Sequence, residues 1–348
     1  MKRLMVVSDA WHPQINGVVR TMERTMADLA AFGVESVTLT PADYRTLPCP
    51  TYPEIRLSVT RPASVHRAIA RAQVDAVHIA TEGPLGILAR RFCIATGQRF
   101  TTSYHTRFPE YLRARVPVPL KWTYAWMRRF HNAAAGCMIA TPSLEADLSA
   151  RGFLHLMRWD RGVDHVQFNP DRPHVLDLPR PIFGYVGRVS VEKNIEAFLN
   201  LDLPGSKVVI GGGPSLDEMR RRFPDTHFLG AKVGEDLANH FASLDAFVFP
   251  SLTDTFGNVL LEALASGVPV AAYPVTGPLD VIGRNGPGVL DNDLRAASLA
   301  ALDISRQRAR EFALNFSWEA SSRQFYDNVV AALNGDAESR GFHKLAAE

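Results

Sequence analysis

Cysteine is scarce in this sequence, and long uncharged apolar segments are missing. The three cysteines, Cys49, Cys93 and Cys137, form no CxxC pair and have no cluster of metal-ligand residues beside them. This pattern excludes a disulfide framework and indicates reduced, mostly buried thiols of a cytosolic protein. No segment approaches the ~18 uncharged apolar residues of a membrane-spanning helix, and the apolar run at residues 5–7 is too short for a signal peptide. We therefore expect a cytoplasmic protein without a transmembrane helix.

Several catalytic signatures are also absent. The sequence contains no GxxxxGK[ST], HExxH or GxSxG motif, which argues against P-loop, zinc-protease and α/β-hydrolase chemistry. The run VIGGGP at residues 209–214 fails as a dinucleotide fingerprint, because Leu216 stands where the third glycine is needed. The acidic triplet DND at residues 291–293 matches a metal-binding DxD pattern but falls after the last expected strand, where we interpret it as a loop. We predict no metal site and no cofactor.

The composition is that of a globular protein with ample core. Of the 348 residues, 46% are hydrophobic and 21% are charged, and this length suits two domains. The net charge of +2 hides an asymmetry, because residues 1–170 hold 21 basic against 13 acidic residues. The basic half is expected to face an anionic surface or ligand.

Two series of short apolar runs alternate with helical segments, which predicts parallel sheets covered on both faces. The first series comprises residues 3–9, 36–40, 76–80, 100–105 and 136–141, and the second 182–188, 207–213, 226–231, 246–251, 269–274 and 288–290. We expect an α/β fold of two doubly wound, Rossmann-like domains that face a cleft. The expected domains are 1–168, joined by a C-terminal helix at about 318–334, and 182–317, with a proline-rich linker at 169–181.

The segment SLTDTFGNVLLEALASGVPV, residues 251–270, carries two acids at a loop–helix junction. Gly257 permits a turn and Asn258 is a fair helix N-cap, so an ordinary buried helix explains most of the segment. That interpretation leaves Asp254 and Glu262 unexplained. A helix N-terminus binds anions, and flanking acids can bind hydroxyls, so the segment favours a ligand that combines phosphate with sugar.

Three further positions fit such a ligand. Arg188 and Lys193 in YVGRVSVEKN follow a strand and can hold a diphosphate from two sides, although surface cations are often only solvated. Gly17 in the NGV loop allows close backbone approach, or it is simply a turn residue. His105 ends an expected strand and is either a structural histidine or part of the cleft.

The segment at residues 107–131 interleaves six basic with six aromatic residues. It is either a packed helix with solvated ends or a surface for anionic lipid. We favour the second interpretation. The residues expected on this membrane and acceptor side are Lys121, Trp122, Trp126, Arg128 and Arg129.

Taken in order, these segments resemble the family-4 retaining glycosyltransferases of the GT-B fold. The resemblance runs from NGV at 16–18 to FSWE at 316–319 and includes YVGRVSVEKN, VVIGGGP, FLGAKVGEDLANHFASLDAFVFPS and TDTFGNVLLEALASGVPV. It implies that Arg188 and Lys193 hold the donor diphosphate, that Asp254 contacts the transferred sugar and that Glu262 contacts the ribose. It also implies donor contacts from Gly17, Lys232, Val233, Phe256, Gly257, Asn258 and Val259. It places Gly17 and His105 on the amino-domain side of the site, and the residues expected to be catalytic are Asp254, His105, Arg188 and Lys193. Asp254 is one methylene shorter than the family's usual glutamate, so the donor sugar stays open.

The TDTFGN and NGV segments are similar to the lipid-glycosylating branch, which includes diacylglycerol glycosyltransferases and phosphatidylinositol mannosyltransferases. The resemblance implies a retaining, metal-independent transfer of a hexose or hexuronic acid from a nucleotide-diphosphate sugar, with a UDP-sugar favoured. The expected acceptor is a membrane lipid such as diacylglycerol, reached by peripheral binding to the inner face of the cell membrane. A GDP-mannose donor, a soluble or polysaccharide acceptor, a nucleotide-sugar epimerase and a non-catalytic nucleotide-sugar-binding protein remain alternatives. No nucleic acid partner is expected, because the basic half contains no recognised reading motif.

Overall fold

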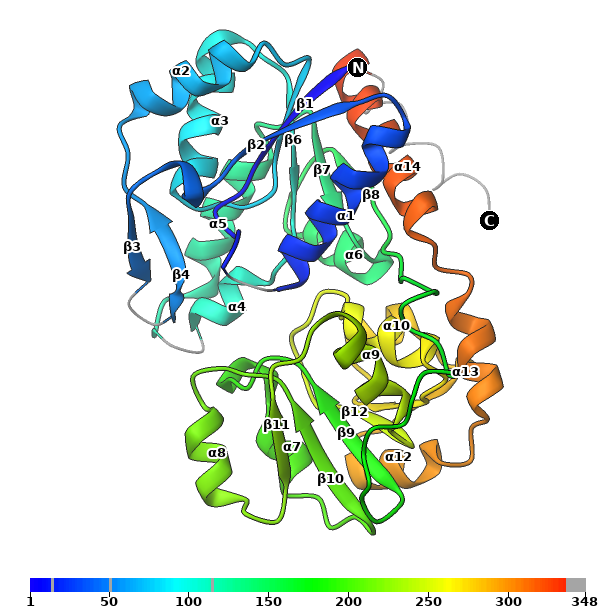
Figure 1. Cartoon of the computed structure of the whole chain (residues 1–348). Coiled ribbons are helices and arrows are strands. Elements are labelled where there is room, and N and C mark those ends of the chain that lie inside the picture. Colours follow the sequence, from blue (N-terminus) through cyan, green and yellow to red (C-terminus); the bar gives the residue numbers. More distant parts are fainter. Residues whose placement is uncertain (14–15, 50–51, 114–115, 336–348) are drawn as a thin grey trace. The chain divides into compact units, whose positions relative to one another are not determined.

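A computed structural model describes residues 1–13, 16–49, 52–113 and 116–335, which form two compact α/β units (Figure 1). Unit 1 combines Met1–Arg161 with the segment that begins at Trp318, and unit 2 comprises Gly162–Ser317. Each unit has its own parallel sheet of six strands. Within the described residues, no helix is both long and apolar enough to cross a membrane.

The sheet of unit 1 has the strand order β2-β1-β5-β6-β7-β8. These strands are β1 (Arg3–Val7), β2 (Glu35–Leu39), β5 (Ala76–Ile79), β6 (Phe100–Ser103), β7 (Gly136–Ile139) and β8 (Leu156–Arg158). The order of strand addition reverses between β1 and β5. Ligands of doubly wound sheets bind outside the carboxyl ends of the strands at such a reversal.

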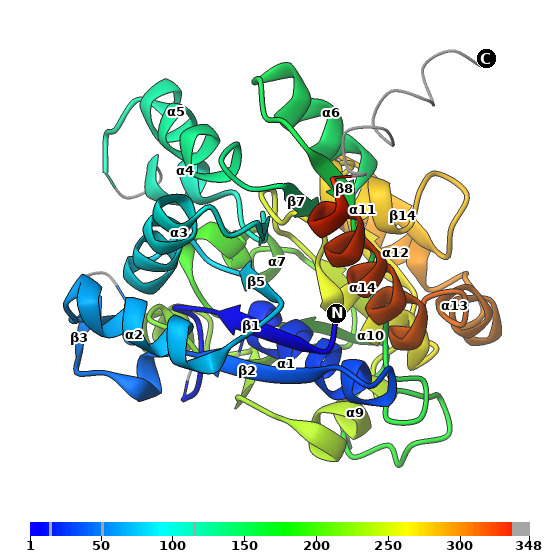
Figure 2. The ribbon, with the colours of Figure 1, turned by 90° about the horizontal axis from the view of Figure 1, so that it is seen from above.

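Helices cover both faces of this sheet. Successive residues of a strand point to opposite faces, and here the residues on both faces are apolar. Leu4 and Val6 of β1 pack with α1 and α14, whereas Met5 and Val7 pack with α2 and α3. Figure 2 shows α1 beside α14 and α2 beside α3. The helices of unit 1 are α1 (Gly17–Ala31), η1 (Pro41–Asp43), α2 (Pro62–Ala72), α3 (Pro84–Thr96), α4 (Phe108–Arg113), α5 (Leu120–His131), α6 (Pro142–Ala150) and α14 (Trp318–Asn334).

The sheet of unit 2 has the strand order β11-β10-β9-β12-β13-β14, which is the Rossmann order 3-2-1-4-5-6. The strands are β9 (Ile182–Val186), β10 (Ser206–Ile210), β11 (His227–Gly230), β12 (Ala246–Phe249), β13 (Val270–Ala272) and β14 (Gly288–Leu290). The helices are η2 (Val191–Lys193), α7 (Ile195–Leu199), α8 (Leu216–Arg222), α9 (Gly234–Ala242), α10 (Asn258–Ala265), α11 (Thr276–Val281), α12 (Leu294–Ala301) and α13 (Arg306–Ala313). The strand order therefore reverses between β9 and β12.

Some elements were not predicted from the sequence. An antiparallel hairpin, β3 (Thr46–Cys49) and β4 (Tyr52–Ser58), follows β2, and β8 adds a strand to the sheet edge. Prolines at positions 48 and 53 obscure the hairpin, because proline weakens any strand prediction.

The division of the chain also differs from the expected one. Unit 1 ends at Arg161 rather than at residue 168, and the stretch expected as a linker, 169–181, belongs to unit 2. Arg172 forms an ion pair with Glu235 at 3.1 Å, and the amide of Val175 donates to the Ser243 hydroxyl at 2.8 Å. These polar contacts tie the proline-rich stretch to unit 2. Residues 336–348 and positions 114–115 of the basic aromatic segment lie outside the described residues.

Candidate active site

In unit 2, two loops meet at the reversal of strand order. One loop follows β9 and contains Arg188 and Lys193, and the other follows β12 and contains Asp254. The side-chain amide of Asn194 donates to the carbonyl of Pro250 at 3.0 Å, and the Thr253 hydroxyl donates to the carbonyl of Glu192 at 3.4 Å. The two loops are therefore bound to each other.

The loop that carries Arg188 is held by the glycine-rich run after β10. The amide of Gly187 donates to the carbonyl of Ile210 at 3.0 Å, and that of Val189 donates to the carbonyl of Gly212 at 2.9 Å. Gly211 has a φ of +154°, and a Cβ there would lie only 1.8 Å from the carbonyl oxygen of Gly187. The run that fails as a dinucleotide fingerprint thus positions the loop of a predicted site residue, a role that the sequence reasoning missed.

Arg188 is half-buried, and its main-chain carbonyl accepts a hydrogen bond from the Tyr185 hydroxyl at 2.6 Å. Burial lowers the pKa of the Arg188 guanidinium, and the carboxylate of Glu192 opposes this effect. A guanidinium is nevertheless charged at neutral pH. Arg188 therefore supplies a partly desolvated, positioned cation at the end of β9.

Lys193 and Asp254 form an ion pair between Nζ and Oδ1. Their side chains are 21% and 14% exposed, so the pair is neither at the open surface nor fully enclosed. The structure thus brings together two residues that the resemblance assigns to different parts of the donor. Charged partners at this depth interact more strongly than exposed pairs do.

Three polar atoms in these two loops are buried without a hydrogen-bond partner among the described residues. They are Ser190 Oγ, Ser251 Oγ and Asp254 Oδ2. Both serines are 1% exposed, and each follows one of the two strands at the reversal, β9 or β12. A buried polar atom without a partner costs free energy, so such a group needs an explanation, and a polar ligand that reaches it supplies one. The sequence reasoning did not identify either serine.

Helix α10 begins next to these loops. The structure corrects the predicted N-cap, because the cap is Gly257 and Asn258 is the first helical residue. Gly257 has a φ of 86°, and no side chain caps the helix. Glu262 lies one turn after Asn258 and is 8% exposed, whereas the ring of Phe256 is packed inside at 7% exposure. The N-terminus of α10 and the carboxyl group of Glu262 are therefore on neighbouring turns.

The segment expected to bind the base follows β11. Val233 is the N-cap of α9 and is 52% exposed. Lys232 forms an ion pair with Asp236 at 3.1 Å. Because β11 is the edge strand, this segment lies at the border of the sheet and not between β9 and β12.

The other two predicted site residues belong to unit 1. Gly17 is the first residue of α1, and the Asn16 side chain accepts hydrogen bonds from the amides of Val18 at 2.9 Å and Val19 at 3.0 Å. His105 lies two positions after the last residue of β6, at the carboxyl end of that strand. Burial and the charge of Arg161 lower the pKa of His105 well below its ordinary value.

Asp9 is a further residue at this edge that the sequence reasoning missed. Its carboxylate accepts hydrogen bonds from the amides of Leu85 at 2.8 Å and Gly86 at 3.1 Å in the first turn of α3. A Cβ on Gly83 would lie 2.4 Å from Asp9 Cγ. Burial raises the pKa of Asp9 to about 6, although these amides lower it. The side chain therefore fastens the end of β1 to the start of α3.

The expected membrane-side residues lie on α5 of unit 1. Trp122 and Trp126 are 65% and 41% exposed, and Lys121, Arg128 and Arg129 are exposed on the same helix. The ring of Trp126 contacts that of Phe108 at a centroid distance of 6.2 Å. The helix thus displays two indole rings and three cations together.

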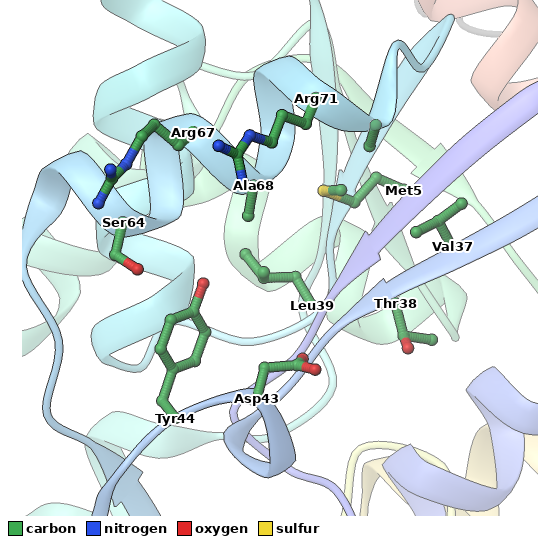
Figure 3. Close-up of a pocket in the computed structure, with 11 residues that line it drawn as sticks. Met5, Val37, Thr38, Leu39, Asp43, Tyr44, Ser64, Arg67, Ala68 and Arg71 are labelled. Atoms are coloured by element: carbon green, nitrogen blue, oxygen red, sulfur yellow. The ribbon is translucent and has the colours of Figure 1, made fainter.

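Figure 3 shows a pocket of about 610 Å³ in unit 1. It lies beside the edge strand β2, and α2 contributes Arg67 and Arg71 to one wall while Asp43 and Tyr44 contribute to another. None of the predicted site residues lines it. This cavity therefore does not coincide with the reversal of either sheet, and we place the candidate site at the loops described above.

The acidic triplet at 291–293 serves local structure. Asp293 caps α12 by accepting hydrogen bonds from the amides of Arg295 and Ala296, and the amide of Asp293 donates to Asp291 at 2.8 Å. In the part of the chain that the structure describes, no three His, Cys, Asp or Glu side chains are grouped as metal ligands.

Solved structures match the fold over nearly the whole chain. Sucrose-phosphate synthase of Thermosynechococcus elongatus has a TM-score of 0.73 at 19% identity, covering 95% of this chain and 100% of that one. Anabaena HepE in complex with UDP and glucose has a TM-score of 0.70 at 12% identity, with the same coverage of 95% and 100%. These identities relate the folds alone, and they define the chain as a protein of the GT-B class.

Sequence comparison identifies the family. The model for Glycosyltransferase Family 4 matches residues 15–167, and the model for Glycosyl transferases group 1 matches residues 180–305. A GDP-mannose-dependent alpha-mannosyltransferase of Mycolicibacterium smegmatis is 30% identical over 320 residues, which are 83% of this chain and 84% of that protein. A sulfoquinovosyl transferase of Arabidopsis thaliana is 28% identical over 326 residues, which are 83% of this chain and 62% of that protein. The chain belongs to glycosyltransferase family 4 and is a glycosyltransferase.

Proposed function

We propose that this enzyme transfers a hexose, with retention of anomeric configuration, from a nucleotide-diphosphate sugar to a membrane lipid. The observation that carries the donor part is the group of buried polar atoms at the reversal in unit 2. Asp254 Oδ2 and the hydroxyls of Ser190 and Ser251 need polar partners that the described protein does not provide. A donor rich in hydroxyl and phosphate oxygens supplies them.

Different charged residues bind different parts of the donor. Arg188 and Lys193 bind the diphosphate, and the carboxylates of Asp254 and Glu262 accept hydrogen bonds from sugar and ribose hydroxyls. The main-chain amides of residues 256–259 lie at the uncapped start of α10, where the helix dipole favours a phosphate. Lys232 and Val233 contact the base.

In the reaction, the bond between the anomeric carbon and the diphosphate oxygen breaks while the acceptor hydroxyl attacks from the same face. The acceptor proton passes to a phosphate oxygen of the departing nucleotide, so no side-chain base and no metal ion is required. Negative charge develops on the leaving diphosphate, where Arg188 and Lys193 stabilise it. Positioned charges act most strongly on such developing charge.

Two classes of donor, GDP-mannose and a UDP-sugar, have support. The similarity to a GDP-mannose-dependent mannosyltransferase supports GDP-mannose, and the resemblance of the sequence motifs supports a UDP-sugar. Asp254, in place of the longer glutamate, sets its carboxylate farther from the sugar and so affects which hydroxyls it reaches. Incubating the protein with each labelled donor and with extracted lipids distinguishes the two by the product formed.

The exposed face of α5 supports a lipid acceptor. Indole rings favour the headgroup region of a bilayer, and each cation near an anionic membrane contributes about 1 kcal/mol. Trp122 and Trp126 with three neighbouring cations therefore suffice for peripheral binding. A lipid hydroxyl is then presented at the surface to which the enzyme is bound.

The donor site is tested by replacing Arg188 and Lys193 singly by alanine. We expect turnover to fall on the order of 10²–10³-fold, the loss found for one positioned group at a developing anion. The matched control is Arg284→Ala, which removes an exposed arginine of unit 2. If both site variants turn over at the wild-type rate, the diphosphate assignment is wrong. Nucleotide release without any acceptor consumption would instead indicate hydrolysis, and a changed sugar on an intact donor would indicate an epimerase.

The acceptor side is tested by vesicle co-sedimentation. Binding should rise with the anionic lipid fraction and fall with salt, because the Debye length shortens to about 8 Å at physiological ionic strength. Replacing Lys121, Arg128 and Arg129 together by serine should weaken binding and lipid glycosylation, while donor hydrolysis stays nearly unchanged. Replacing Arg220, Arg221 and Arg284 by serine removes equal charge from unit 2 as the control. Efficient transfer to a soluble acceptor without vesicle binding would refute the lipid proposal.

A further inference from the structure

Arg161 is a buried arginine directly beside His105. The residue is 5% exposed, and Nη1 donates to the main-chain carbonyls of Trp159 at 2.6 Å and Asp160 at 3.2 Å. The guanidinium lies over the indole ring of Trp159, 4.1 Å from the ring centroid. The carbonyls and the ring hold the planar group in one orientation.

In that orientation the second terminal nitrogen faces the histidine ring. Arg161 Nη2 is 3.4 Å from His105 Nδ1, and the His105 ring meets the edge of Trp159 at a centroid distance of 5.8 Å. An arginine has five N–H donors and no acceptor. His105 Nδ1 must therefore present its lone pair to Arg161, which leaves the ring hydrogen on Nε2.

The surroundings act in the same sense. Burial lowers the pKa of His105 well below its ordinary value, and the neighbouring titratable groups Arg161, His78 and His131 lower it further. His131 has its own partner in Glu82, at 3.1 Å. A protonated His105 would set an Nδ1–H against a guanidinium N–H, so the neutral ring is the form that this packing accepts.

We propose that Arg161 is a positioning residue that fixes His105 as the neutral Nε2–H tautomer, so that His105 donates a hydrogen bond to a substrate oxygen and does not act as a proton acceptor. This inference rests on the proposed function, together with the place at the active site that the family resemblance implies for His105. It assigns Arg161 a task that a lysine cannot perform. A lysine lacks the planar fork that reaches the two carbonyls and the imidazole at once.

The tautomer is measured directly by nitrogen NMR of histidine-labelled full-length protein, with His105→Gln used to assign the signal. We expect a neutral Nε2–H ring that does not titrate between pH 5 and 9. In Arg161→Met, the fixed donor to Nδ1 is gone, so the signal should move towards a mixture of tautomers or begin to titrate. Arg158→Met removes a nearby arginine that donates to the carbonyl of Ala140 and to Asp160, and should leave the signal unchanged.

Kinetics supply a second readout that remains usable if Arg161→Met does not fold. The side-chain amide of glutamine can place an N–H near the position of Nε2, whereas that of asparagine reaches only the position of Nδ1. We therefore expect His105→Gln to retain roughly tenfold more turnover than His105→Asn, the difference made by about one hydrogen bond. An Nδ1–H or charged ring in the wild type, or equal loss in the two variants, would overturn the inference. The NMR result is independent of donor identity, so it stands apart from failure of the proposed transfer reaction.

Discussion

Replacing Asp254 by asparagine separates the two tasks of the Lys193–Asp254 pair. The substitution keeps the shape of the side chain and removes its charge. Lys193 is paired with Asp254, so the lysine must leave or share this partner to bind a diphosphate. Without the negative charge of the carboxylate, Lys193 is held less strongly at this position, so a diphosphate competes with a weaker partner.

The size of this effect follows from the burial of the pair. Exposed ion pairs contribute about 0.2–1 kcal/mol, and breaking buried pairs costs about 3–5 kcal/mol. The side chains of Lys193 and Asp254 are 21% and 14% exposed, which places the interaction between these limits, at about 1–2 kcal/mol. Free GDP or UDP should therefore bind Asp254→Asn roughly 5–30-fold more tightly than it binds the wild type.

Sugar transfer should change in the opposite direction. The sugar hydroxyls lose a charged acceptor in Asp254→Asn, so turnover falls even though the nucleotide binds more tightly. Asp254→Glu keeps the charge and should lose less turnover. Titration calorimetry with GDP and UDP, together with initial rates of transfer, measures the two effects separately.

The control is Asp291→Asn, which removes an exposed acid of the loop after β14. It should change neither nucleotide affinity nor turnover. If free nucleotide binds Asp254→Asn no more tightly than the wild type, while Lys193→Ala weakens binding, the pair does not restrain Lys193 and the reasoning is refuted. A changed melting temperature with unchanged kinetics would assign Asp254 a structural task only.

Three other outcomes are expected. Ser251→Ala should reduce donor affinity a few-fold in calorimetry without lowering the thermal midpoint, because the Ser251 hydroxyl has no partner in the described protein; a lowered midpoint with unchanged affinity would contradict this. Gly211→Ala should destabilise unit 2 by about 2 kcal/mol or more in denaturant unfolding, since its Cβ would lie 1.8 Å from the Gly187 carbonyl; wild-type stability would disprove the packing role. Burial, with the charge of Arg161, lowers the pKa of His78 from 6.5 to about 3. Between these two pH values His78 is protonated in the unfolded chain and neutral in the folded protein. The stability that this group contributes is present above pH 6.5 and is lost as pH falls towards 3, by about 1.4 kcal/mol per pH unit. When unfolding free energies are measured with urea at several pH values, those of His78→Gln should therefore fall less steeply with decreasing pH than those of the wild type.

The architecture could be predicted from the sequence because it depends on local patterns. Each expected apolar run contains a strand, and the alternation with helices corresponds to two parallel sheets. Strands buried on both faces are apolar at nearly every position, so the runs in Arg3–Val7 and Ile182–Val186 are recognisable without any knowledge of their neighbours. The paired strands β3 and β4 were missed because sequence prediction depends on such local patterns and their prolines break the pattern.

Candidate residues at strand ends were also accessible from the sequence, because their positions relative to the strands are local. Arg188 follows β9 directly, and His105 follows β6. The helix start at residues 257–258 could be predicted only approximately. The choice of Gly257 as the N-cap depends on a φ of 86°, which glycine adopts at little cost and which the order of residues did not require.

Only the tertiary structure decided which of these residues meet. Lys193 and Asp254 are 61 positions apart, and Arg161 and His105 are 56 positions apart. Such contacts depend on the order in which strands pair, and a change of strand order would separate these residues while every local pattern stayed the same. The lack of a hydrogen-bond partner for the Ser251 hydroxyl was likewise decided by the tertiary structure. Whether a buried group has a partner depends on the residues packed around it and not on its own position in the chain.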